Sequence, residues 1–163
     1  MPCATLAPAV CHQAGMGKIV LAKGPDTITT VLGSCVGISM YHPRTHQGLL
    51  AHVVLPASTG RAATPGKFAD TAVPDMLSQL ASLGICDSSL IIKIAGGSNM
   101  FGLPAGPMQV GESNIVAIEA ALSKAKLRIT ARHVGGNKGR RVTLDCQTGI
   151  YRVEVVGADV VVL

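Results

Sequence analysis

The sequence has few aromatic and few charged residues, and these shortages argue against some classes of function. It contains no tryptophan, two tyrosines and two phenylalanines among 163 residues. Single-stranded nucleic acids are bound largely by stacking bases on aromatic side chains, and no helix-turn-helix or zinc-finger pattern is present. Charged residues make up only 14% of the chain, with a formal net charge of +5. We therefore expect no nucleic-acid binding and a partner with an acidic protein surface.

Long apolar runs and paired cysteine motifs are also missing. No run is long enough to cross a bilayer, and the first 15 residues lack the charged start and apolar stretch of a secretory signal. The five cysteines form no C-x-x-C pair, which favours neither a disulfide framework nor a thiolate zinc site. We expect a cytoplasmic protein with free thiols, no membrane insertion and no bound metal.

The composition predicts one compact domain with many tight turns, because 48% of the residues are apolar and 19 are glycine. Residues 1–15 are rich in Pro, Ala and Gly, so we expect a flexible N-terminal tail followed by a folded domain over residues 16–163. Strand patterns occur at residues 16–23, 27–31, 36–41, 49–55, 89–95, 127–134, 141–146 and 150–156, and helical patterns at 67–83 and 113–127. This order predicts an α+β fold with mixed β-sheet and about two to three flanking helices.

One predicted helix contains a proline. Pro74 fits within residues 67–83 if Asp70 or Thr71 caps the helix, which would place Pro74 in the first turn.

The most informative stretch pairs a cysteine with a histidine. Cys35 follows a Gly-Ser turn and precedes an alternating run, and His52 is the one polar residue in the apolar run at 49–55. Two adjacent short strands are expected to form a hairpin. An imidazole near a thiol can stabilise the thiolate and later protonate a leaving group, which predicts a cysteine nucleophile. On spacing alone, a small buried hydrophobic cysteine is the favoured alternative.

Several motifs in this chain resemble those of the CheD family, the chemoreceptor glutamine deamidases of bacterial chemotaxis. The resemblance begins with TTVLGSCV at residues 29–36 and AHVVLP at residues 51–56. It continues through KFAD at 67–70, KIAGGSNMF at 93–101 and GGNKGR at 135–140, and so covers roughly residues 16–156. In GESN at residues 111–114, Ser113 replaces the arginine that is usual in the family, so we expect no contact of the kind that this arginine would make.

The resemblance implies a β-sandwich flanked by helices and a set of catalytic residues. By position, the family's catalytic cysteine, histidine and threonine fall on Cys35, His52 and Thr29. We expect Thr29 to orient His52. Backbone amides near Ser34 and Cys35 are candidates for oxyanion binding.

Two further glycines are candidates for the same site. Gly96 and Gly97 are expected to allow close backbone packing beside the cysteine turn, and their amides are alternative contacts for the substrate or the oxyanion.

The resemblance also implies the reaction and the partners. The expected reaction is hydrolysis of glutamine side chains in the cytoplasmic helices of chemoreceptors through a cysteine thioester, with no metal or organic cofactor. The expected partners are the cytoplasmic domain of a chemoreceptor and a CheC-type phosphatase. Two alternatives stay open, namely a methylesterase that acts on receptor methylglutamates and a non-catalytic partner of a CheC-type phosphatase.

Overall fold

The computed structural model describes residues 7–60, 63–104 and 109–163 and contains two five-stranded sheets and two α-helices in this part of the chain. In spatial order, the first sheet consists of β1 (Cys11–Gln13), β3 (Thr27–Leu32), β8 (Arg140–Asp145), β9 (Tyr151–Val155) and β10 (Val161–Val162). The second sheet consists of β2 (Ile19–Lys23), β5 (Gln47–Val53), β4 (Val36–His42), β6 (Ile91–Gly96) and β7 (Ile129–Val134).

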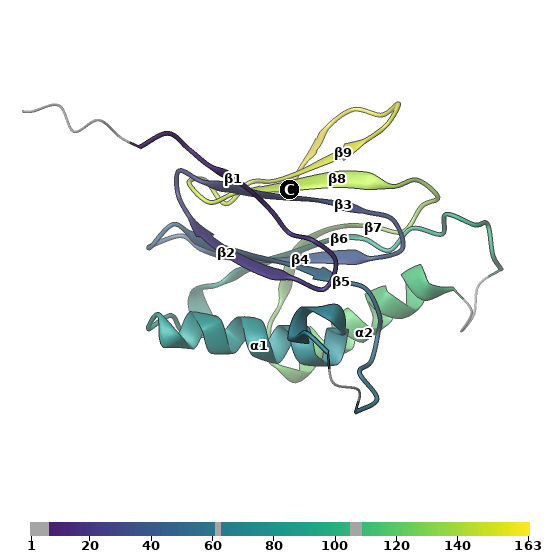
Figure 1. The fold of residues 1–163 in the computed structure, drawn as a ribbon, viewed down its shortest axis with the longest axis horizontal. Coiled ribbons are helices and arrows are strands. Elements are labelled where there is room, and N and C mark those ends of the chain that lie inside the picture. The colour runs from purple at the N-terminus through teal and green to yellow at the C-terminus, as the bar shows by residue number, and fades with distance from the viewer. Residues whose placement is uncertain (1–6, 61–62, 105–108) are drawn as a thin grey trace, which may run out of the picture.

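The elements form three layers, as Figure 1 shows, with the second sheet lying between the first sheet and the helices α1 (Ala69–Ser82) and α2 (Val110–Lys124). Both faces of the middle sheet are therefore covered. All seven residues of β4, at the centre of that sheet, are buried. Short 3-10 turns at Pro65–Lys67 and Asp87–Ser89 precede α1 and β6.

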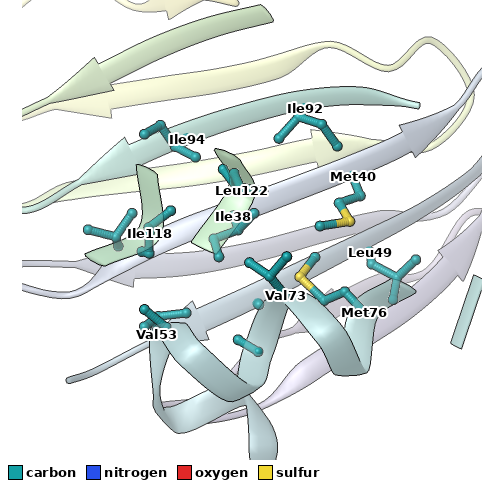
Figure 2. Close-up of a cluster of buried hydrophobic side chains, with 14 of the residues drawn as sticks. Ile38, Met40, Leu49, Val53, Val73, Met76, Ile92, Ile94, Ile118 and Leu122 are labelled. Atoms are coloured by element: carbon teal, nitrogen blue, oxygen red, sulfur yellow. The ribbon is translucent and has the colours of Figure 1, made fainter. Parts of the chain in front are cut away.

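Two hydrophobic cores lie between the three layers. Figure 2 shows the core between the middle sheet and the helices, where Ile38 and Val53 from the strands meet Met76 of α1 and Leu122 of α2. The other core lies between the two sheets. It contains Ala14, Ala22, Ile28, Leu32, Leu50, Ala95, Val142, Leu144, Cys146, Tyr151 and Val153.

The expected α+β fold with mixed, sandwich-like sheets and flanking helices is confirmed. The predicted hairpin is also present, since β4 and β5 pair antiparallel. None of the helices in the described residues is both long and apolar enough to span a membrane.

Two expectations differ from the structure. Part of the segment expected to be a flexible tail is ordered, because β1 pairs parallel with β3; residues 1–6 lie outside the described part. The placement of Pro74 in the first turn is wrong. Helix α1 begins at Ala69, so Pro74 lies inside the helix. Because proline has no backbone N–H, the helical hydrogen bond from residue 74 to the carbonyl of Asp70 is missing.

Candidate active site

Cys35 lies where the chain crosses from one sheet to the other. Strand β3 of the first sheet ends at Leu32, and β4 of the middle sheet begins at Val36, so the turn at residues 33–35 joins the two layers. The thiol is partly buried against the core between the sheets. The turn therefore presents Cys35 at one end of the sandwich.

All three carbonyls of this turn accept hydrogen bonds. Gly33 O accepts from the amide of Ser98 at 2.9 Å, and Cys35 O accepts from the amide of Gly97 at 2.8 Å. Ser34 O accepts from Asn114 Nδ2 at 3.0 Å. The amides of Ser34 and Cys35 themselves donate no hydrogen bond within the described residues. The turn is thus fixed through its three carbonyls.

Gly96 and Gly97 allow this arrangement because a side chain would not fit. A Cβ on Gly96 would lie 2.3 Å from Cys35 O, and Gly96 and Gly97 have φ angles of 113° and 68°. The expected close packing beside the cysteine turn is therefore present. The amide of Gly97 is used by Cys35 O, so it holds the turn in place and is occupied as a donor.

His52 is buried on β5, with 4% of its surface exposed. It lies opposite Gly37 of β4, and it shares a strand face with Leu50, which belongs to the core between the sheets. Its Nδ1 atom lies 2.8 Å from Thr30 Oγ1 and 3.2 Å from Ala14 O. The Nδ1 atom of His52 is thus held by two neighbours.

Gly37, opposite His52, leaves room for the side chain of Tyr151. A Cβ at this position would lie 2.5 Å from the hydroxyl of Tyr151, which itself donates to Gly37 O at 3.3 Å. Cys35 is two residues from Gly37 and also faces the core between the sheets. Cys35, one residue before β4, and His52 of β5 therefore both lie on the side of the middle sheet that faces the first sheet.

Burial sets the protonation state of this pair. It raises the pKa of the Cys35 thiol. It also lowers the pKa of His52, against a smaller opposing effect of the hydrogen bond to Ala14. No hydrogen bond joins the two side chains among the described residues. The sequence suggested a stabilised thiolate, whereas both pKa shifts favour the neutral forms of the thiol and the imidazole.

Thr29, which the resemblance places beside the histidine, has its hydroxyl elsewhere. Its Oγ1 donates to Val142 O at 2.8 Å and lies 3.1 Å from Thr143 Oγ1, both in β8. Its carbonyl accepts from the amide of Ala14 at 2.9 Å, so Thr29 reaches the residue that contacts His52 only through the backbone.

Sequence reasoning missed three contributors to the site: Thr30, Ala14 and Asn114. Strand alternation contained the signal for Thr30, because Ile28 and Leu32 are core residues and Thr30 lies between them on the same face. Asn114 is fully buried and bridges Ser34 O and Val54 O. In the part of the chain that the structure describes, no group of three or more His, Cys, Asp or Glu side chains is placed to hold a metal ion.

Comparisons with known proteins agree on one family. Residues 54–155 match the family model described as CheD chemotactic sensory transduction. A protein named probable chemoreceptor glutamine deamidase CheD from Methanococcus vannielii is 44% identical over 135 residues, which cover 82% of this chain and 88% of the relative.

Two further relatives extend over more of the chain. A probable chemoreceptor glutamine deamidase CheD from Clostridium botulinum is 38% identical over 93% of this chain and 96% of its own length. The chemoreceptor glutamine deamidase CheD of Thermotoga maritima is 38% identical over 88% of this chain and 90% of its own length. With this degree of identity over nearly the whole fold, the chain belongs to the CheD family.

Proposed function

We propose that this protein is an amidohydrolase that converts glutamine side chains of chemoreceptor cytoplasmic helices to glutamate and releases ammonia. The observation that supports the proposal is that Cys35 and His52 lie on the same side of the middle sheet, next to a turn whose Ser34 and Cys35 amides donate no hydrogen bond within the described residues. The names of the relatives supply the substrate class. We place the reaction in the cytoplasm, where the receptor helices are found.

In the proposed mechanism, Cys35 starts as a neutral thiol and His52 as a neutral imidazole. His52 accepts the thiol proton as the sulfur of Cys35 attacks the amide carbon, and the amides of Ser34 and Cys35 bind the resulting oxyanion. The intermediate collapses when the imidazolium gives its proton to the departing nitrogen, which leaves as ammonia and forms a thioester. His52 then deprotonates a water molecule that attacks the thioester carbon. Glutamate is released, and the proton returns to Cys35.

A protein partner is a second part of the proposal. A CheC-type phosphatase that docks over the cysteine turn would compete with the receptor helix, so its addition should slow deamidation. Simultaneous binding of both partners with an unchanged rate would argue against a shared surface.

Mass spectrometry of a receptor cytoplasmic fragment tests the function. The protein is incubated with the unmodified fragment and, separately, with a fragment methylated at its glutamates. Conversion of glutamines in the first fragment supports the deamidase. Methyl loss from the second alone would make the protein an esterase, and no change in either would favour a non-catalytic partner.

A further inference from the structure

Thr30 Oγ1 and the carbonyl oxygen of Ala14 are the two hydrogen-bonding neighbours of His52 Nδ1. Which of these groups can donate a proton decides whether Nδ1 is protonated. Thr30 Oγ1 lies 2.6 Å from Ala14 O and 2.8 Å from His52 Nδ1, and Nδ1 lies 3.2 Å from the same carbonyl. Thr30 is 4% exposed and Ala14 is 2% exposed, so solvent has little access to these groups. The three atoms form a closed triangle.

The protons in this triangle can be assigned by counting donors. A carbonyl oxygen only accepts, and a hydroxyl has a single proton to donate. The 2.6 Å contact therefore needs the proton of Thr30, which leaves Thr30 Oγ1 as an acceptor towards His52. Nδ1 then faces two acceptors and must carry the ring proton itself. In the opposite arrangement, the hydroxyl would donate to Nδ1 and two bare oxygens would lie 2.6 Å apart in a buried site.

We infer that Thr30 is a positioning residue that, with the carbonyl of Ala14, holds His52 as the Nδ1–H tautomer and leaves the lone pair of Nε2 free for the proton of Cys35. This inference rests on the proposed function, since it gives His52 the role of base. Thr29, the position that the resemblance indicates, contributes only its carbonyl, which fixes the amide of Ala14.

The strand explains why these adjacent threonines differ. Successive side chains of β3 point to opposite faces of its sheet, so Thr30 faces the middle sheet with Ile28 and Leu32 while the hydroxyl of Thr29 reaches β8. β1 supplies the second contact because it pairs with β3 up to Gln13 and so places Ala14 beside the pair.

Nitrogen-15 NMR of the imidazole rings tests the tautomer without any substrate. The His52 signals are assigned by their loss in His52→Gln. At a pH where the ring is neutral, we expect the Nδ1 resonance of a protonated nitrogen and the Nε2 resonance of an unprotonated one. In Thr30→Val, which keeps the shape and removes the hydroxyl, a shift towards a tautomer mixture is expected. Thr30→Ser should restore the original spectrum.

Kinetics with the receptor fragment give the second readout. Thr30→Val should lower kcat by roughly tenfold to a hundredfold with little change in KM, by analogy with the loss found when residues that orient metal-ligating side chains are replaced. Thr30→Ser should recover most of the rate. Thr27→Val, on the same strand, is the control and should keep full activity, and Thr29→Val should keep the Nδ1–H tautomer.

The outcomes separate the inference from the proposed function. An Nε2–H tautomer in the unaltered protein, or a spectrum and kcat that are unchanged in Thr30→Val, overturns the inference. If the tautomer responds to Thr30 as expected but no receptor glutamine is converted, the positioning of His52 stands and the proposed reaction fails.

Discussion

Asn114 and Ser34 are joined by a hydrogen bond that ties helix α2 to the cysteine turn. Asn114 Nδ2 donates to Ser34 O at 3.0 Å and also to Val54 O at 2.9 Å, two residues beyond His52. The buried amide of Asn114 thus connects the turn that carries Cys35 to the end of β5, the strand that carries His52.

Replacement of Asn114 should therefore affect both stability and catalysis. Asn114→Leu leaves two part-buried carbonyls without this donor, which should lower the free energy of unfolding by about 1–3 kcal/mol and lower kcat. Val116→Ala on the exposed side of α2 is the control. Denaturant unfolding and receptor-fragment kinetics check the two effects. A variant that unfolds like the control and keeps its kcat would show that the bridge is dispensable.

The pH profile should reflect the buried imidazole. Because burial lowers the pKa of His52, the neutral base persists to lower pH than it would for an exposed histidine, whose pKa is about 6.5. The acid limb of kcat/KM should therefore have its midpoint below about 6.5. A midpoint clearly above that value would contradict a neutral Cys35–His52 pair.

Removal of the N-terminal segment should impair catalysis. A deletion through Ala14 removes β1 and the carbonyl that contacts Thr30 and His52. We expect at least a tenfold loss of kcat, together with reduced stability, since an orienting group and a strand are both lost. A shorter deletion that ends before Val10 keeps these contacts and serves as the control. Equal activity of the two deletions would show that Ala14 has no role.

Gly96 should tolerate a methyl group poorly. In Gly96→Ala the Cβ would meet Cys35 O at 2.3 Å, so the cysteine turn must move. Gly84→Ala is a matched control, because Gly84 also has a positive φ, 75°, but has open space around it. We expect both variants to lose stability through backbone strain, and only Gly96→Ala to lose activity in the receptor-fragment assay. Full activity of Gly96→Ala would contradict a fixed turn.

The sequence predicted the parts of this structure that depend on local pattern. The alternation after Cys35 and the apolar run around His52 predicted the β4–β5 hairpin, and the helical spacing predicted α1 and α2 to within a few residues. Strands β1 and β10 were missed because segments of three and two residues carry no readable period.

The finer features of the site depend on long-range contacts. Ala14, Thr30 and His52 are brought together by the parallel pairing of β1 with β3 and by the packing of the two sheets. No pattern within either segment encodes that meeting. The effect of burial on the Cys35 thiol was likewise hidden, because it depends on the core that surrounds the turn.

The central claim is that the thiol of Cys35 performs the reaction, and a comparison of cysteine variants tests it most directly. A receptor cytoplasmic fragment is incubated with the unaltered protein, with Cys35→Ala and with Cys86→Ala, an exposed cysteine remote in sequence, after unfolding curves have shown that all three are folded. Conversion of glutamine to glutamate is followed by mass spectrometry. We predict that the unaltered protein and Cys86→Ala convert the same glutamines at the same rate and that Cys35→Ala converts none. Conversion by folded Cys35→Ala at the rate of the unaltered protein would contradict the account.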